Sequence, residues 1–202
     1  MKINHIISIL LTMFFFTTIA YGQTNKTATD YLSIPGPVVF EKISYNLSWS
    51  SHPNDVYYKQ EYIAKGDVAE KFKTMVFFDV FTGETNVKDV VAAKVAELKK
   101  MKETNPVVNY EAFDNPKSGE YMLDFLLSEN MPDGNLSIVE RNVYRYKTFT
   151  DKSGKKGILL FAVSTRSYGK DIDNFFTSLK ANRKDLINAV AQFNIPTISI
   201  KK

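Results

Sequence analysis

The sequence predicts an α+β fold: a largely antiparallel sheet of about seven strands with helices packed on it. Two observations lead to this prediction. Stretches with strand-type alternation outnumber those with helix-type spacing, and short polar turns join most of them in pairs, as in hairpins. The two helix-type stretches lie in the middle and at the end of the chain, so they do not alternate regularly with strands.

The first strands begin at residue 38. Apolar residues stand at every second position from Ile43 through Leu47 to Trp49, so this stretch predicts a half-buried strand with Trp49 facing the core. The letters "SSHPND" then predict a turn that contains His52, followed by a strand in "VYYKQEYIA". The apolar run "TMVFFDVFTG" predicts a central strand that is covered on both faces.

The first helix is predicted after Asn86, a capping residue, and a stripe of apolar residues at helical spacing continues to about Thr104. Two hairpins follow, with loops at "DNPKSG" and "TDKSGKKG". Residues 172–193 then predict one helix or two short ones, with a possible restart at Asn182. The predicted order is therefore three strands, a helix, four strands and a helix.

The N-terminus has the pattern of a secretory signal peptide. A basic start precedes an apolar run of about 15 residues and the small residues Ala20 and Gly22. We predict a signal peptide over 1–22, a flexible lead-in over 23–37 and a single α+β domain over 38–202. The run is too short to span a bilayer and later stretches are less apolar, so we expect no transmembrane segment after signal cleavage and a soluble protein that is periplasmic or secreted.

Composition excludes several kinds of function. The net charge of +4 is too small to indicate nucleic-acid binding, and export makes that partner less plausible still. The chain has no cysteine, and His52 is the one histidine outside the signal peptide, so zinc, copper and haem sites lack ligands. We therefore expect neither a metal nor a cofactor.

Two carboxylates interrupt apolar strands: Asp79 in "MVFFDVF" and Asp124 in "MLDFLL". A buried carboxylate either pairs with a cation or has a raised pKa, and two such groups facing each other can perform acid–base catalysis. The alternatives are a structural ion pair with Arg141, Arg145 or Arg166, and exposure on a solvated face of the sheet.

The order of elements resembles the PsbP-like fold, which includes the photosystem PsbP proteins, a Ran-GTPase-binding family and exported bacterial DcrB-like proteins. The resemblance is carried by "EYIAKGD" before "FKTMVFF", by "NVYRYKTF" and "KKGILLFAVSTRS", and by the closing "RKDLINAVAQF". It implies an α/β/α sandwich whose functions are mostly binding and assembly. It carries over no catalytic residues.

We therefore predict a non-catalytic binding or assembly domain whose partner is a protein or a component of the cell envelope. Tyr and Arg often dominate interface energies, so the strand with Tyr144, Arg145 and Tyr146 is the predicted contact surface, and the alternative is that these tyrosines fill the core beneath the last helix. A hydrolase using Asp79 and Asp124 and a carrier of a small apolar ligand are the competing hypotheses.

Overall fold

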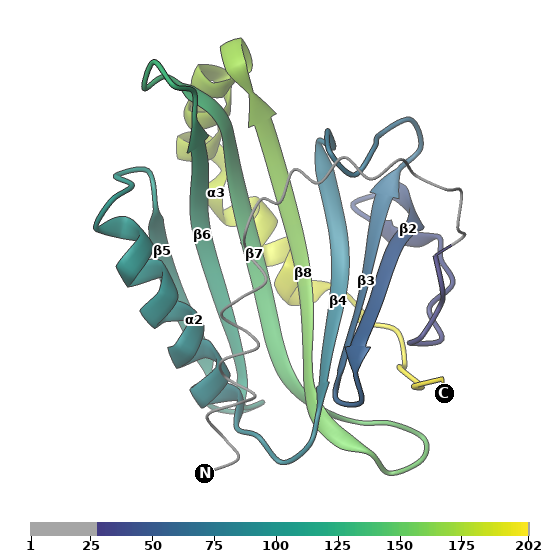
Figure 1. The fold of residues 1–202 in the computed structure, drawn as a ribbon. Coiled ribbons are helices and arrows are strands. Elements are labelled where there is room, and N and C mark those ends of the chain that lie inside the picture. Colours follow the sequence, from purple (N-terminus) through teal and green to yellow (C-terminus); the bar gives the residue numbers. More distant parts are fainter. Residues whose placement is uncertain (1–27, 202) are drawn as a thin grey trace.

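A computed structural model describes residues 28–201 as one eight-stranded antiparallel sheet with two helices, a mixed α+β arrangement (Figure 1). The strands are β1 (Val38–Phe40), β2 (Ile43–Asn54), β3 (Tyr57–Ala64), β4 (Thr74–Thr82), β5 (Asn109–Asn115), β6 (Glu120–Asn130), β7 (Leu136–Thr150) and β8 (Lys156–Tyr168). The helices are α2 (Val87–Lys102) and α3 (Ile172–Gln192), and a single 3₁₀ turn, Gly169–Asp171, precedes α3.

The strands lie in the order β1-β2-β3-β4-β8-β7-β6-β5, and each pairs with its neighbours in antiparallel fashion. The chain builds half of the sheet up to β4, crosses through α2 to the far edge at β5, and returns strand by strand to β8 beside β4. The apolar side chains of α2 pack on one face of the sheet and those of α3 on the other. We call these the α2 face and the α3 face.

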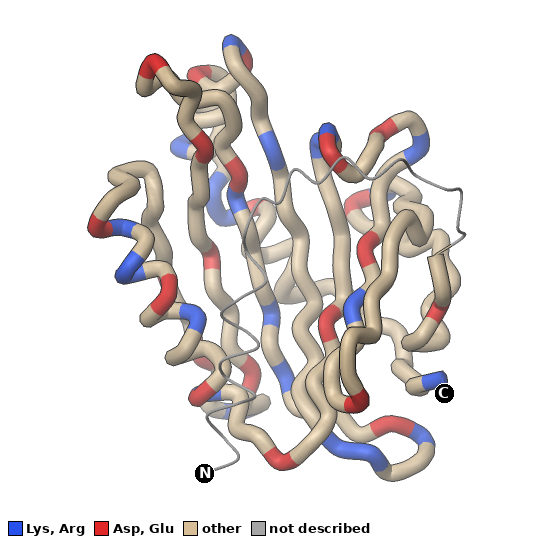
Figure 2. Tube along the Cα trace, viewed as in Figure 1, with Lys and Arg blue, Asp and Glu red and all other residues tan. Residues whose placement is uncertain are grey.

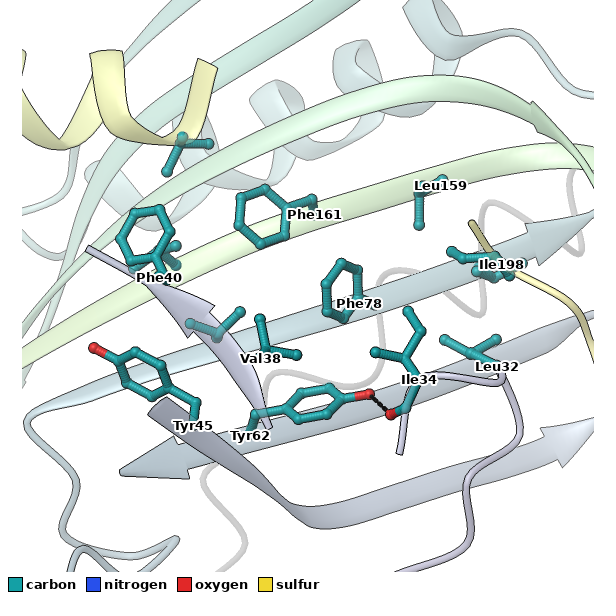
Figure 3. Packing of buried hydrophobic residues seen from close by; sticks show 14 of the residues in the cluster. Leu32, Ile34, Val38, Phe40, Tyr45, Tyr62, Phe78, Leu159, Phe161 and Ile198 are labelled. Carbon is teal, nitrogen blue, oxygen red and sulfur yellow. Dashed lines mark hydrogen bonds between the residues drawn. The ribbon is translucent and has the colours of Figure 1, made fainter. Parts of the chain in front are cut away.

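The α3 face carries a large aromatic core (Figure 3). Phe78 of β4 and Phe161 of β8 pack against each other with ring centroids 5.3 Å apart, and Phe161 stacks on Phe193 just beyond α3. The Tyr62 hydroxyl donates a 2.6 Å hydrogen bond to the carbonyl of Ile34, which satisfies both polar groups inside this core.

The predicted flexible lead-in over 23–37 is wrong for its last residues. Leu32 and Ile34 are buried in the core of the α3 face, and the Leu32 N–H donates to the side chain of Gln60. The C-terminal segment runs alongside, where the Ser199 N–H donates to the Leu32 carbonyl. Apolar residues among polar neighbours therefore anchor this segment to the sheet. The predicted signal peptide lies outside the described residues.

The sheet has one strand more than predicted because residues 38–50 form two strands instead of one. Glu41 and Lys42 form a tight turn between β1 and β2, with φ values of 48° and 66°. Left-handed backbone at two successive positions is usually signalled by Gly or Asn, and neither occurs here. The residues of this turn therefore gave no indication that the chain reverses direction there.

Trp49 does not face the core, contrary to the prediction. Leu47 pairs with Tyr62 and Trp49 with Glu61, so Ser48 is an extra residue in β2, a β-bulge. Because the bulge shifts the alternation by one residue, Leu47 lies on the α3 face and Trp49 on the α2 face. The Trp49 side chain is 42% exposed.

His52 lies within β2, three residues before the turn at Asp55 and Val56, whereas the sequence predicted that His52 would lie in the turn itself. Its ring stacks on Tyr58 of β3 with centroids 4.0 Å apart, and its Nδ1 lies 3.0 Å from the Tyr57 carbonyl. His52 therefore has a packing role on the α3 face. The prediction that it would be an ordinary turn residue was wrong in position, although no group of catalytic partners surrounds it in the part of the chain described.

The two helices follow the predicted pattern closely. The Asn86 side chain accepts a 2.8 Å hydrogen bond from the Lys88 N–H and so caps α2. In α3 the backbone at Asn182 departs from helical geometry, with φ −125° and ψ 25°, which matches the predicted restart. Neither of the described helices is long and apolar enough to cross a membrane.

Candidate functional site

The two carboxylates singled out in the sequence lie on opposite faces of the sheet. Asp79 pairs with Leu160, which pairs with Tyr146, so these three share the α2 face. Asp124 pairs with Val143, whose side chain belongs to the core of the α3 face. Directly opposed residues share a face and successive residues alternate, so the sheet separates the two carboxyls. They cannot act together on one bond.

Asp124 is a structural ion-pair residue. It is buried between β6, β7 and α3, where it accepts hydrogen bonds from Arg141 Nε at 2.9 Å and Arg183 Nε at 2.8 Å. Arg141 also donates to the backbone carbonyl of Arg183, at 2.6 Å. The ion pair with Arg141 that the sequence suggested is thus present, and it joins the sheet to α3 at the residue after the kink.

Asp79 has a different environment. Its Oδ2 accepts a 3.1 Å hydrogen bond from the Tyr57 hydroxyl, whereas its Oδ1 is buried and has no hydrogen-bond partner within the described chain. Burial raises the pKa of Asp79 to about 6, although the ammonium group of Lys59 on the neighbouring strand partly opposes that rise. Asp79 therefore changes charge close to neutral pH and keeps one oxygen available as an acceptor.

Charges of both signs surround Asp79 on the α2 face, but they are paired with one another. The ion pairs near Asp79 are Lys59–Glu61 on β3 and Lys94–Glu97 on α2, and a third pair, Arg166–Glu140, lies further along the same face between β8 and β7. No ion pair among residues 28–201 includes Asp79. Figure 2 shows charged residues along α2 and along β3, β6 and β7, whereas the middle of β8 is uncharged.

Exposure increases from Asp79 toward β2. The side chain of Asp79 is deeply buried, those of Lys59 and Glu61 on β3 are 19% and 18% exposed, and Trp49 on β2 is the most exposed of the four. Lys59 lies directly opposite Asp79 in the β3–β4 pair, and its Nζ lies 4.7 Å from the centre of the Phe77 ring. This group is called the Asp79 surface below. It consists of Trp49, Tyr57, Lys59, Glu61, Phe77 and Asp79.

The predicted contact residues Tyr144 and Tyr146 are core residues. They are 3% and 2% exposed and pack on the α2 face, where Tyr144 forms edge-to-face contacts with Phe77 and Phe125. β7 is covered on both faces, so these tyrosines are not available to a partner. They lie beneath α2, not beneath the last helix as the sequence-based alternative supposed.

Arg145, the third predicted contact residue, lies on the opposite face and stabilises the end of α3. Its guanidinium donates to the carbonyls of Val190 and Phe193, and it pairs with Glu120 through a 2.9 Å hydrogen bond. Cationic side chains commonly satisfy the last carbonyls of a helix in this way. The role of Arg145 is therefore structural.

The described residues include no group of three or more His, Cys, Asp or Glu side chains placed to hold a metal ion. A small cavity lies between β6 and α3 and is lined by Asp124, Arg141 and Arg183. These three side chains already bind one another, and Lys180 of α3 also lines the cavity.

Comparison with known proteins gives one match. A protein-family model matches residues 32–195, which include all eight strands and both helices. The chain belongs to this family. The matched range begins at Leu32, the first buried residue of the N-terminal segment, and ends after α3. No curated protein and no solved structure matches the chain.

Sequence reasoning found Asp79 but missed the residues around it. Tyr57 and Lys59 lie on β3, and the loop of residues 65–73 that joins β3 to β4 gives no indication of register. The spacing of the two strands in the sequence therefore did not predict that Lys59 would stand opposite Asp79.

Proposed function

We propose that this protein is an exported, non-catalytic binding or assembly domain, and that it binds a protein or envelope partner through the Asp79 surface. One observation carries the proposal: a buried carboxylate with an unpartnered oxygen lies on the same sheet face as the exposed Trp49. An exposed tryptophan beside a desolvated polar group is the composition of an interface centre. The proposed contact surface therefore lies on β2–β4 instead of β7, on the other side of β8.

Two further arguments support the proposal. The signal-peptide pattern of residues 1–22 favours a periplasmic or secreted protein, which meets envelope or extracellular partners. The resemblance to the PsbP-like fold, with its α/β/α sandwich, favours binding and assembly over catalysis. An open antiparallel sheet with a helix on each face is compatible with that resemblance.

The proposal can be tested by capture from the envelope fraction of the exporting cell. The wild-type protein is compared with Trp49→Ser and with Met131→Ser. Met131 is a matched control because it is also 42% exposed and lies in the β6–β7 turn, away from the Asp79 surface. We expect the wild type and Met131→Ser to retain the same partner and Trp49→Ser to lose it.

Equal capture by all three proteins would exclude the Asp79 surface as the contact site. The chain has one tryptophan, so its fluorescence gives a second measurement on the same surface. A change in Trp49 emission produced by small apolar molecules, without any captured macromolecule, would favour the carrier hypothesis over the proposal.

A further inference from the structure

We propose that the Asp79 surface recognises a lysine or arginine side chain of a partner protein, flanked in the partner by apolar residues. This inference rests on the proposed function and names the chemistry that the surface would accept. It is carried by the charges, by the aromatic side chains and by the gradient of exposure across the α2 face.

The charges favour a cation. Around Asp79 each basic group is already matched with an acid: Lys59 with Glu61 and Lys94 with Glu97. Asp79 adds one carboxylate to these two pairs, so the group as a whole has an excess of one negative charge when Asp79 is ionised. A desolvated carboxylate oxygen without a donor is costly, and a charge-assisted hydrogen bond from a bound cation would remove that cost.

The aromatic side chains suit the same ligand. Phe77 already holds one ammonium group over its ring, that of Lys59 at 4.7 Å, so this face stabilises cations through its aromatic rings as well as its carboxylates. Trp49 offers exposed apolar area at the β2 side of the surface. Apolar residues next to the partner's basic side chain would cover that area.

The exposure gradient gives the direction of approach. A side chain that enters over Trp49 meets the half-buried Lys59–Glu61 pair and then Asp79 behind it. The long, flexible stem of a lysine or arginine suits this route because its methylene groups can lie along apolar surface while the charged end reaches the carboxylate. A short polar side chain would not reach Asp79 past this pair.

The pH dependence follows from the groups that face Asp79. These are Tyr57, Lys59 and Glu61 on β3, Lys94 on α2, and Tyr144 and Tyr146 on β7. Burial holds the pKa of Asp79 at about 6, so this carboxyl is ionised at pH 7.5 and largely protonated at pH 5. Recognition of a cation is therefore expected to weaken as the pH falls through 6.

The test uses two acetylated and amidated peptides, Gly-Phe-Lys-Phe-Gly and its neutral counterpart Gly-Phe-Gln-Phe-Gly, titrated into the purified protein with Trp49 fluorescence as the readout. At pH 7.5 we expect the lysine peptide to bind at least about tenfold more tightly, a difference of about 1.4 kcal/mol. At pH 5 the two peptides should bind alike. Asp79→Asn should abolish the preference at pH 7.5, and Asp185→Asn, which changes an exposed carboxyl on α3, should retain it.

Several results would overturn the inference: no preference for lysine in the wild type, a preference that persists at pH 5, or a preference that persists in folded Asp79→Asn protein. Binding of phosphatidylethanolamine vesicles without binding of the lysine peptide would also overturn it, because the ammonium would then come from a lipid. The pH series on the wild type decides the matter even if Asp79→Asn does not fold, which circular dichroism would reveal.

Failure of this inference is distinguishable from failure of the proposed function. If envelope capture is lost in Trp49→Ser but retained in Asp79→Asn, the surface binds its partner without using a cation, and only the inference fails. If both variants retain the partner, the Asp79 surface is not the contact site and both proposals fail.

Discussion

Replacing Asp79 with asparagine tests the physical basis of the candidate site through stability alone. The folded-state pKa of Asp79 is about 6, against 3.8 for an unperturbed aspartate. A difference of about two pKa units corresponds to about 3 kcal/mol of folding free energy at pH values above both. Because the folded-state pKa is the higher one, the native state binds the proton more tightly between pH 4 and 6. The free energy of unfolding of the wild type should therefore fall as the pH rises through this interval.

The Asp79→Asn variant keeps an oxygen that accepts the Tyr57 hydroxyl hydrogen bond but cannot ionise. Its new amide N–H₂ is buried and costs about 1 to 2 kcal/mol, so we expect it to be more stable than the wild type by about 1 to 2 kcal/mol at pH 7.5. At pH 4 it should be the less stable of the two. Urea denaturation, followed by far-ultraviolet circular dichroism at pH 4, 5, 6 and 7.5, measures the free energy of unfolding of the wild type and of Asp79→Asn. Asp185→Asn is the control for loss of one exposed carboxyl.

The decisive quantity is how the stability difference between wild type and variant changes with pH, because the amide cost is the same at every pH. A difference that stays constant within about 0.5 kcal/mol from pH 4 to 7.5 would show that Asp79 is not titrating in a desolvated environment. The charge argument for the Asp79 surface would then be refuted.

Four further substitutions test other parts of the structure, each by its effect on the free energy of unfolding. His52→Ala should cost about 1 to 2 kcal/mol because it removes a stacked ring, whereas Trp49→Ala should change stability by less than about 1 kcal/mol because that side chain is largely solvated. Tyr144→Ala should cost about 3 to 5 kcal/mol, since it empties a buried aromatic site. Asp124→Ala should cost about 3 to 5 kcal/mol because it leaves the guanidinium of Arg141 buried without its carboxylate.

Controls separate these effects from general damage. Glu111→Ala removes only the exposed partner of Arg183 and should cost within about 1 kcal/mol. A Trp49→Ala variant less stable than His52→Ala would mean that β2 keeps a regular alternation past Ser48. A folded, stable Tyr144→Ala variant would return the tyrosines of β7 to the surface, as the sequence first suggested.

The fold was largely predictable because its signals are local. The stripe of α2, its Asn86 cap, the two hairpins from β5 to β8 and the restart in α3 each depend on residues close together in the sequence. The errors share one cause. The turn at Glu41 and Lys42 and the bulge at Ser48 are backbone features without a characteristic residue, and each changes how the following side chains are oriented.

The site was less predictable because it depends on contacts between strands. The sequence indicated that Asp79 and Asp124 are buried, but assigning them to opposite faces requires the register of β4, β8, β7 and β6. The same limit applies to Tyr144: in a central strand both faces are covered, so alternation carries no information about which side faces solvent. Only the pairing of β3 with β4 places Lys59 beside Asp79.

The bulge in β2 also bears on how the chain tolerates changes in length. Ser48 has no pairing position of its own in the ladder, because Leu47 and Trp49 occupy the consecutive positions opposite Tyr62 and Glu61, although the Ser48 hydroxyl donates to the Glu61 carbonyl. A chain lacking Ser48 could keep every one of these pairs in a regular ladder, whereas loss of Leu47 or Trp49 would put the serine in the place of an apolar side chain. Residue 48 is thus the place in β2 where one residue can be lost while the core half of the strand and the half that carries Trp49 both stay in place.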